Sequence, residues 1–234
     1  TGYLSLKNDT GKLIAKVFFT YYKKDGEPSG KRPVTFTFNG GPGSSSVWLH
    51  MGGLGPKRVL LQDDGLATAP PYQYINNEYS WLNKTDLVFI DPVSTGFSRA
   101  ASGENAKQFH GYVEDISSMG SFIRHFLSRY ERWGSPKYLA GESYGTTRAA
   151  GLSKFLQDRY RIFLNGIFLI SAVLNFGTND YYVGNDLPRA LYIPSYTAAA
   201  WYHKKLAPAL QVDLKKTLKE AEAFALGEYA SALL

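Results

Sequence analysis

The sequence predicts an α/β fold with a mostly parallel sheet and flanking helices. Four short runs are rich in β-branched and aromatic residues and lie between turn signals, as buried strands do. These runs occupy residues 34–38, 87–90, 138–140 and 167–171. Apolar residues recur at helical spacing in two of the gaps, over residues 104–132 and 146–160. Strands that alternate with helices favour a parallel sheet with helices on both faces.

The two ends of the chain depart from this alternation. Residues 2–6 and 12–22 alternate polar and apolar side chains around a turn at residues 9–11, which predicts an antiparallel edge hairpin. From about residue 179 the strand signals stop and helical composition takes over. We therefore expect a core over residues 1–178 and a partial helical cap or insertion over residues 179–234. We also expect the sheet to be incomplete in this chain.

Composition excludes several classes of protein. There are no cysteines, which rules out disulfides, thiolate catalysis and cysteine zinc sites. The net charge of +6 comes from scattered basic pairs, whereas nucleic-acid binders concentrate their basic residues. No apolar stretch approaches the roughly 18 residues that span a bilayer. The sequence also carries no metal-binding motif, so we expect no metal and no other cofactor.

The pentapeptide Gly-Glu-Ser-Tyr-Gly at residues 141–145 is the strongest catalytic signal. It matches G-x-S-x-G and lies between a predicted strand and a predicted amphipathic helix, the context of a nucleophile elbow. Ser143 would then begin a helix, where free N–H groups and the helix dipole favour developing negative charge. The alternative is that Ser143 only caps the helix.

A glycine-rich loop at residues 39–46 follows the strand at 34–38. Its sequence, Asn-Gly-Gly-Pro-Gly-Ser-Ser-Ser, fits neither of the glycine-rich phosphate-binding patterns. Acyl transfer at an elbow needs a backbone N–H from a neighbouring loop to complete an oxyanion hole. Consecutive glycines can supply that amide, although a simple tight turn is the alternative.

Four motifs in order resemble those of the serine carboxypeptidases, a family of the α/β-hydrolase type. The glycine loop resembles N-G-G-P-G-x-S-S, and residues 141–144 resemble the G-E-S-Y nucleophile motif. Between them, residues 79–81 resemble Y-S-W, and residues 87–93 with 95–98 resemble D-x-P-x-G-x-G-F-S. Because it has no cysteine, the sequence resembles the bacterial branch of this family.

The resemblance implies a role for each residue of the site. Ser143 would be the acylated nucleophile, and the amides of Gly41 and Tyr144 would form the oxyanion hole.

The same resemblance implies that Asn39, the Gly40 amide and Glu142 bind the substrate's terminal carboxylate. Two carboxylates at hydrogen-bond distance cannot both stay ionised cheaply, so we expect a shared proton and tighter peptide binding at acid pH. Two departures bear on this pocket and leave strict exopeptidase specificity open. Thr37 replaces a usual Trp, and Gly53 stands where many members have an acidic residue.

The base that would activate Ser143 is not evident. Hydrolases of this type order their triad as Ser, Asp and His along the chain. The only later histidine is His203, in a basic helix of the predicted appendage, where we expect a surface role. The earlier histidines His50, His110 and His125 are expected to be packing or surface groups. The resemblance implies a longer C-terminal part that holds the Asp and the His. We therefore expect an N-terminal fragment that is inactive alone.

These observations predict a serine-type carboxypeptidase that acts on peptides. A carboxypeptidase-like acyltransferase and a non-catalytic peptide-binding module are the alternatives. We expect no nucleic-acid or membrane partner, and a homodimer is open. The expected location is the bacterial periplasm or the exterior, although the chain shows no targeting signal.

Overall fold

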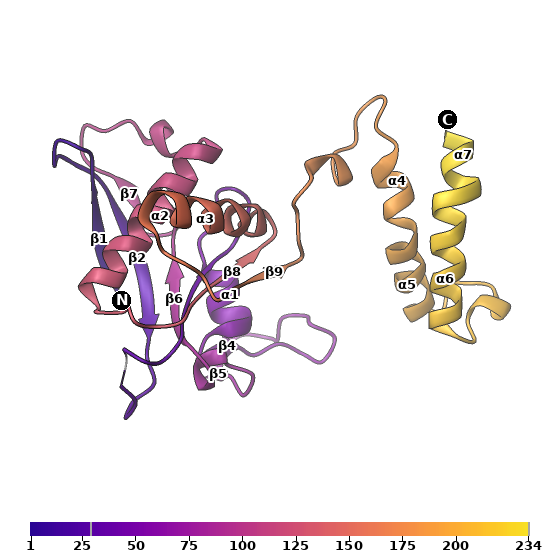
Figure 1. The fold of residues 1–234 in the computed structure, drawn as a ribbon. Helices are drawn as coiled ribbons and strands as arrows, with labels where there is room; N and C mark the ends of the chain where they lie inside the picture. Colours follow the sequence, from indigo (N-terminus) through magenta and orange to yellow (C-terminus); the bar gives the residue numbers. More distant parts are fainter. Residues whose placement is uncertain (29, 234) are drawn as a thin grey trace. The chain divides into compact units, whose positions relative to one another are not determined.

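The computed structural model describes residues 1–28 and 30–233. The chain divides into two compact units, Thr1–Leu174 and Asn175–Leu234 (Figure 1). The assignment of residues 1–178 to a hydrolase core and 179–234 to a cap stays a prediction.

The first unit is built on a seven-stranded sheet with the order β1-β2-β6-β3-β8-β9, in which β7 also pairs with β2. The strands β6, β3, β8 and β9 pair in parallel, whereas β1 and β2 pair in antiparallel fashion. Their bounds are β1 Gly2–Lys7, β2 Leu13–Tyr22, β3 Val34–Phe38, β6 Asp86–Ile90, β7 Arg99–Ala100, β8 Lys137–Glu142 and β9 Gly166–Ile170. The predicted mostly parallel sheet and its edge hairpin are confirmed.

Two long helices, α2 (Tyr112–Arg129) and α3 (Tyr144–Tyr160), pack on each other and on one face of this sheet (Figure 1). The predicted flanking helices are confirmed, but both long helices lie on the same face, and the strand order explains why. The steps from β6 to β8 and from β8 to β9 run the same way across the sheet. Right-handed crossovers therefore place both helices on the same side.

The opposite face is covered by short elements from the connection between β3 and β6, which crosses the sheet the other way. Leu49 and Leu54 pack there on Leu87, Phe89 and Ala140. The elements of this connection are α1 (Val47–Leu49), the π-helix η1 (His50–Leu54), the 3₁₀ helix η2 (Trp81–Asn83) and the two-stranded sheet of β4 (Lys57–Val59) and β5 (Tyr74–Asn76).

Two predicted elements differ in detail. The helix expected from residue 104 begins at Tyr112, because Gly111 is extended at its N-cap, and Ala106–Phe109 form a separate 3₁₀ helix, η3. Strand β9 was expected to be buried. Its apolar residues 167–169 are instead 37–43% exposed, because β9 is the last strand of the sheet among the described residues.

A buried ion cluster joins the starts of the central strands to the end of α2. Asp86 accepts hydrogen bonds from Arg32 Nε at 2.7 Å and from Arg132 Nη1 at 2.6 Å. All three side chains are buried. Removing one member of such a cluster leaves an uncompensated buried charge.

The described part of the second unit, residues 175–233, is helical, as predicted. Asp213 caps α6 by accepting hydrogen bonds from the amides of Lys215 and Lys216. The unit contains η4 Phe176–Thr178, α4 Leu187–Leu191, α5 Ile193–Tyr202, η5 Pro208–Leu210, α6 Leu214–Phe224, the π-helix η6 Ala225–Tyr229 and α7 Ala230–Leu233. Across the described residues of both units, no helix has the length and apolar character to cross a bilayer.

Candidate active site

Ser143 lies at a sharp turn between β8 and α3. Its backbone has φ 57° and ψ −126°, a sparsely populated region for a residue with a side chain. The turn is held by the Ser143 amide, which donates to the Ile170 carbonyl at 3.0 Å, and by the Ser143 carbonyl, which accepts from the Thr146 amide at 2.8 Å. The Ser143 side chain makes no capping hydrogen bond to α3, so the capping alternative lacks its defining contact.

Glycines bring the elbow and the glycine loop into direct backbone contact. A Cβ on Gly40 would lie 2.5 Å from the Tyr144 nitrogen and 3.0 Å from Ser143 Cβ. A Cβ on Gly141 would lie 2.0 Å from the Gly145 oxygen, and one on Gly145 would lie 2.7 Å from the carbonyl oxygen at the end of β3. The close packing of these backbones therefore depends on glycine at all three positions.

The glycine loop itself needs positive φ. Gly41 has φ 110° and Gly43 has φ 118°, values that residues with side chains rarely adopt. The Ser44 amide donates to the Gly40 carbonyl at 3.1 Å and closes the loop. Within residues 1–28 and 30–233, the amides of Gly40 and Gly41 donate no hydrogen bond to a protein acceptor. They are therefore available to an external anion.

Asn39 and Glu142 meet beside Ser143. Asn39 is 1% exposed, and its Nδ2 donates to Glu142 Oε2 at 2.9 Å. Its Oδ1 accepts a hydrogen bond from the Leu49 amide at 3.0 Å, which fixes the orientation of the side-chain amide. One hydrogen on Nδ2 is left over for a ligand.

These groups share an open cavity of about 480 Å³. The side chain of Trp48, 71% exposed, forms one wall. The other lining residues are Asn39, Gly40, Gly41, Ser44, Leu49, Gly52, Gly53, Glu142 and Ser143. The structure thus brings five of the six predicted site residues to one cavity. The sixth, Tyr144, begins α3 directly after Ser143 and lines a second cavity.

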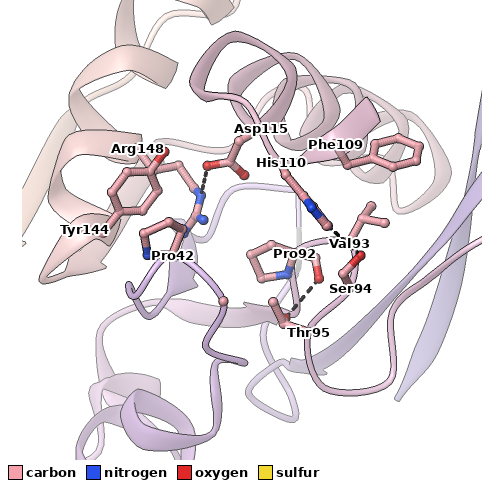
Figure 2. Close-up of a pocket in the computed structure, with 11 residues that line it drawn as sticks. Pro42, Pro92, Val93, Ser94, Thr95, Phe109, His110, Asp115, Tyr144 and Arg148 are labelled. Atoms are coloured by element: carbon pink, nitrogen blue, oxygen red, sulfur yellow. Dashed lines mark hydrogen bonds and ion pairs between the residues drawn. The ribbon is translucent and has the colours of Figure 1, made fainter. Parts of the chain in front are cut away.

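The second cavity, of about 370 Å³, shares no lining residue with the first (Figure 2). Figure 2 shows Tyr144, Arg148 and Asp115 grouped together, with Arg148 Nε donating to Asp115 Oδ2 at 2.8 Å. Pro42 and Gly43 of the glycine loop also line it. Different residues of the glycine loop thus line the two cavities.

The sequence analysis missed the pair of Arg148 and Asp115. Burial raises the pKa of Asp115, and the Arg148 guanidinium opposes that rise. Burial also raises the pKa of the Tyr144 hydroxyl, and the nearby Asp115 raises it further. The available signal was a charged residue on the apolar face of α3, next to Ala149 and Leu152.

Asp91 supports the glycine loop from the end of β6. It accepts hydrogen bonds from the amides of Ser46 at 2.9 Å and Phe97 at 3.2 Å. A Cβ on Gly96 would lie 1.9 Å from Asp91 Oδ2. Burial raises the pKa of Asp91, while the two amides oppose the rise. The segment that begins with Asp91 and Pro92 therefore braces the loop that follows β3.

No histidine in residues 1–28 and 30–233 is hydrogen-bonded to Ser143. His50 Nε2 contacts the Tyr22 hydroxyl at 2.9 Å, and burial lowers the pKa of His50. His110 Nε2 contacts a serine hydroxyl of the second cavity, Ser94 Oγ, at 3.0 Å. Burial lowers the pKa of His125 on α2. His203 follows α5 in the second unit and is exposed.

The acidic residues that follow the elbow have other contacts. Asp158 pairs with Lys154 at 2.6 Å on α3. Asp186 pairs with Arg189 at 3.0 Å in the second unit. The described residues also contain no cluster of three His, Asp or Glu side chains that could hold a metal ion.

Several known proteins are similar to this chain in sequence. The family model described as serine carboxypeptidase matches residues 1–226. Serine carboxypeptidase-like 36 of Arabidopsis thaliana is 31% identical over 179 residues, which are 74% of this chain and 34% of that protein. Pheromone-processing carboxypeptidase kex1 of Schizosaccharomyces japonicus is 31% identical over 173 residues, which are 71% of this chain and 30% of that protein. The chain therefore spans about a third of the length of these relatives.

A solved structure shows the same fold. The crystal structure of Kex1(delta)p, a prohormone-processing carboxypeptidase from Saccharomyces cerevisiae, aligns with a TM-score of 0.56 and 20% identity. The alignment covers 98% of this chain and 48% of that protein. With the family match over nearly its whole length, the chain belongs to the serine carboxypeptidase family.

Proposed function

We propose that the protein is a serine-type carboxypeptidase that removes C-terminal residues from peptides through an acyl-enzyme on Ser143. One observation carries the proposal: the nucleophile, the Gly41 amide and the hydrogen-bonded pair of Asn39 and Glu142 line the same cavity. A group that binds a terminal carboxylate next to a nucleophile selects the last peptide bond.

The remaining hydrogen of Asn39 Nδ2, the Gly40 amide and Glu142 bind the terminal carboxylate of the peptide. Glu142 and this carboxylate share a proton, since two anions at such a distance are costly to keep ionised. The proposal therefore includes peptide binding that strengthens as the pH falls.

Ser143 Oγ attacks the scissile carbonyl carbon and forms a C–O bond while its proton passes to a base. The carbonyl oxygen becomes an anion that the amides of Gly41 and Tyr144 stabilise, and each such donor contributes about 3–4 kcal/mol in comparable enzymes. The C–N bond then breaks, and the leaving amine takes the proton from the base. Water then attacks the ester carbon and gives a proton to the base, the bond between that carbon and Ser143 Oγ breaks, and the base returns the proton to Oγ.

The base is a further part of the proposal. A serine hydroxyl is a weak nucleophile without one. No histidine or carboxylate in the described part of the chain is hydrogen-bonded to Ser143, so the proposal requires a histidine and an acid from elsewhere in the protein.

The test uses the protein expressed from its complete coding sequence. N-blocked peptides are incubated with the wild type and with Ser143→Ala, and the products are followed by mass spectrometry. We expect sequential loss of C-terminal residues with the wild type and none with Ser143→Ala. Transfer of the acyl group to an added alcohol or amine in preference to water would support an acyltransferase. Peptide binding without turnover would support a binding module.

The biological setting stays a proposal as well. We propose peptides as the partners and a secreted or periplasmic location in a bacterium, with neither nucleic acid nor membrane as a ligand.

A further inference from the structure

We infer that Arg148 is a positioning residue that aims the Gly40 amide at the substrate's terminal carboxylate. The inference rests on the proposed function and adds a residue that acts from the far side of the glycine loop.

Arg148 lies on α3 and is buried, and its side chain contacts α2 and the end of β3. Its side chain is 2% exposed, and its Nε donates to Asp115 Oδ2 at 2.8 Å. Its Nη1 donates to the backbone carbonyl of Asn39 at 2.9 Å. The guanidinium carbon lies 5.3 Å from the ring centre of Phe38 and 5.2 Å from that of Tyr144. The guanidinium is thus held by ion pairing, hydrogen bonding and two aromatic rings.

The bond to Asn39 sets the direction of the next amide. The Asn39 carbonyl and the Gly40 N–H belong to one peptide unit, and that unit is trans. In a planar trans peptide the C=O and the N–H point in opposite directions. Because Arg148 holds the carbonyl oxygen, the Gly40 N–H points away from Arg148.

The opposite side of this peptide is the cavity of the nucleophile. Gly40 lines the cavity that holds Ser143 and Glu142, whereas Arg148 lines the other cavity. The Gly40 amide donates to no protein acceptor among the described residues. Arg148 therefore presents an unused donor to the ligand without touching the ligand.

A cation on the carbonyl also strengthens the donor. A hydrogen bond accepted by a peptide carbonyl polarises the unit, and chains of hydrogen bonds reinforce one another in a low-dielectric interior. Arg148 thus fixes the direction of the Gly40 N–H and makes it a better partner for a carboxylate.

The test compares two substrates that give the same acyl-enzyme. One is an N-blocked dipeptide with a free carboxylate, and the other is the same N-blocked dipeptide with a C-terminal carboxamide, which has no terminal carboxylate. The ratio of their kcat/KM values measures the contribution of the carboxylate. It does not depend on the amount of folded enzyme, because the same molecules process both substrates.

We expect Arg148→Met to lower this ratio by about tenfold, mainly through KM of the dipeptide, since a hydrogen bond to a charged group is weakened. Arg148→Lys keeps the positive charge but lacks the planar guanidinium, so its ratio should lie between those of Arg148→Met and the wild type. Arg159→Met, an exposed arginine on the same helix, should leave the ratio unchanged.

An Arg148→Met variant that loses activity equally on both substrates would overturn the inference, because Arg148 would then only support the fold. A wild type that processes the dipeptide through Ser143 but shows no preference for it over the carboxamide would refute the carboxylate site and this inference together. A wild type that cleaves neither substrate would refute the proposed function.

Discussion

The contact between Gly40 and the elbow gives the sharpest prediction, because one added methyl group should push the glycine loop away from the elbow. In Gly40→Ala the new Cβ would lie 2.5 Å from the Tyr144 nitrogen and 2.7 Å from the Glu142 carbonyl oxygen. Both neighbours are backbone atoms, which cannot rotate away. Gly40 does not have a positive φ, so alanine fits its backbone conformation and the effect is one of contact alone.

The expected magnitude follows from what the contact positions. To relieve the overlap the glycine loop must move off the elbow, which would disrupt the proposed oxyanion hole of the Gly41 and Tyr144 amides. Loss of one oxyanion donor costs about 100- to 1,000-fold in kcat. Overpacking of this kind also costs about 1–3 kcal/mol in the free energy of unfolding. We expect both losses in Gly40→Ala.

The assay is steady-state hydrolysis of a chromogenic ester, with urea unfolding of the same preparations. Gly134→Ala is the matched control, since its new Cβ meets only one atom, at an ordinary 3.5 Å. A Gly40→Ala enzyme with wild-type kcat would refute the reasoning that backbone contact between loop and elbow builds the oxyanion hole.

Three further predictions concern stability and pH. Asp86→Ala leaves Arg32 and Arg132 without their buried partner, and we expect the free energy of unfolding in urea to fall by about 3–5 kcal/mol; a loss below 1 kcal/mol would contradict this. Burial lowers the pKa of His50, so protonation of this side chain favours the unfolded state. The free energy of unfolding should therefore be unaffected by His50 above about pH 6.5 and should decline as the pH falls through the folded-state pKa. His50→Gln should weaken that decline in thermal unfolding between pH 7 and 5, and an unaltered slope would count against it. Free-acid peptides should bind more tightly as the pH falls from neutral to mildly acidic, and Glu142→Gln should flatten that dependence in calorimetric titrations; a flat wild-type profile would rule out the shared proton.

The parts of the fold that local sequence encodes could be predicted. The strand positions and the edge hairpin follow from runs and turns of a few residues, and the structure has them within one or two residues of the expected bounds. The elbow and the glycine loop were recognisable for the same reason. Glycines at 40, 141 and 145 are needed by contacts between backbones, and a glycine is visible in a sequence.

Features that depend on strand order could not be predicted. Both long helices cover one face because the chain crosses the sheet in one direction twice, and the sequence does not state the order of the strands. The exposure of β9 has a similar origin, since an apolar strand looks the same in a sequence whether it is central or last in a sheet.

The pair of Arg148 and Asp115 was missed because it joins two helices across 33 residues. Neither residue lies in a recognisable motif, and only the burial of the charge marks it. The six predicted site residues were named from motifs, whereas the residue that orients one of them could be found only from the packing.

The most direct test of the central claim is covalent labelling by a fluorophosphonate, with the modified residue located by tandem mass spectrometry in the protein expressed from its complete coding sequence. We predict a single adduct on Ser143 that forms at least 100-fold more slowly in Gly40→Ala, about the cost of one lost oxyanion donor. An adduct on another residue, or labelling of Ser143 at the same rate in both proteins, would contradict it.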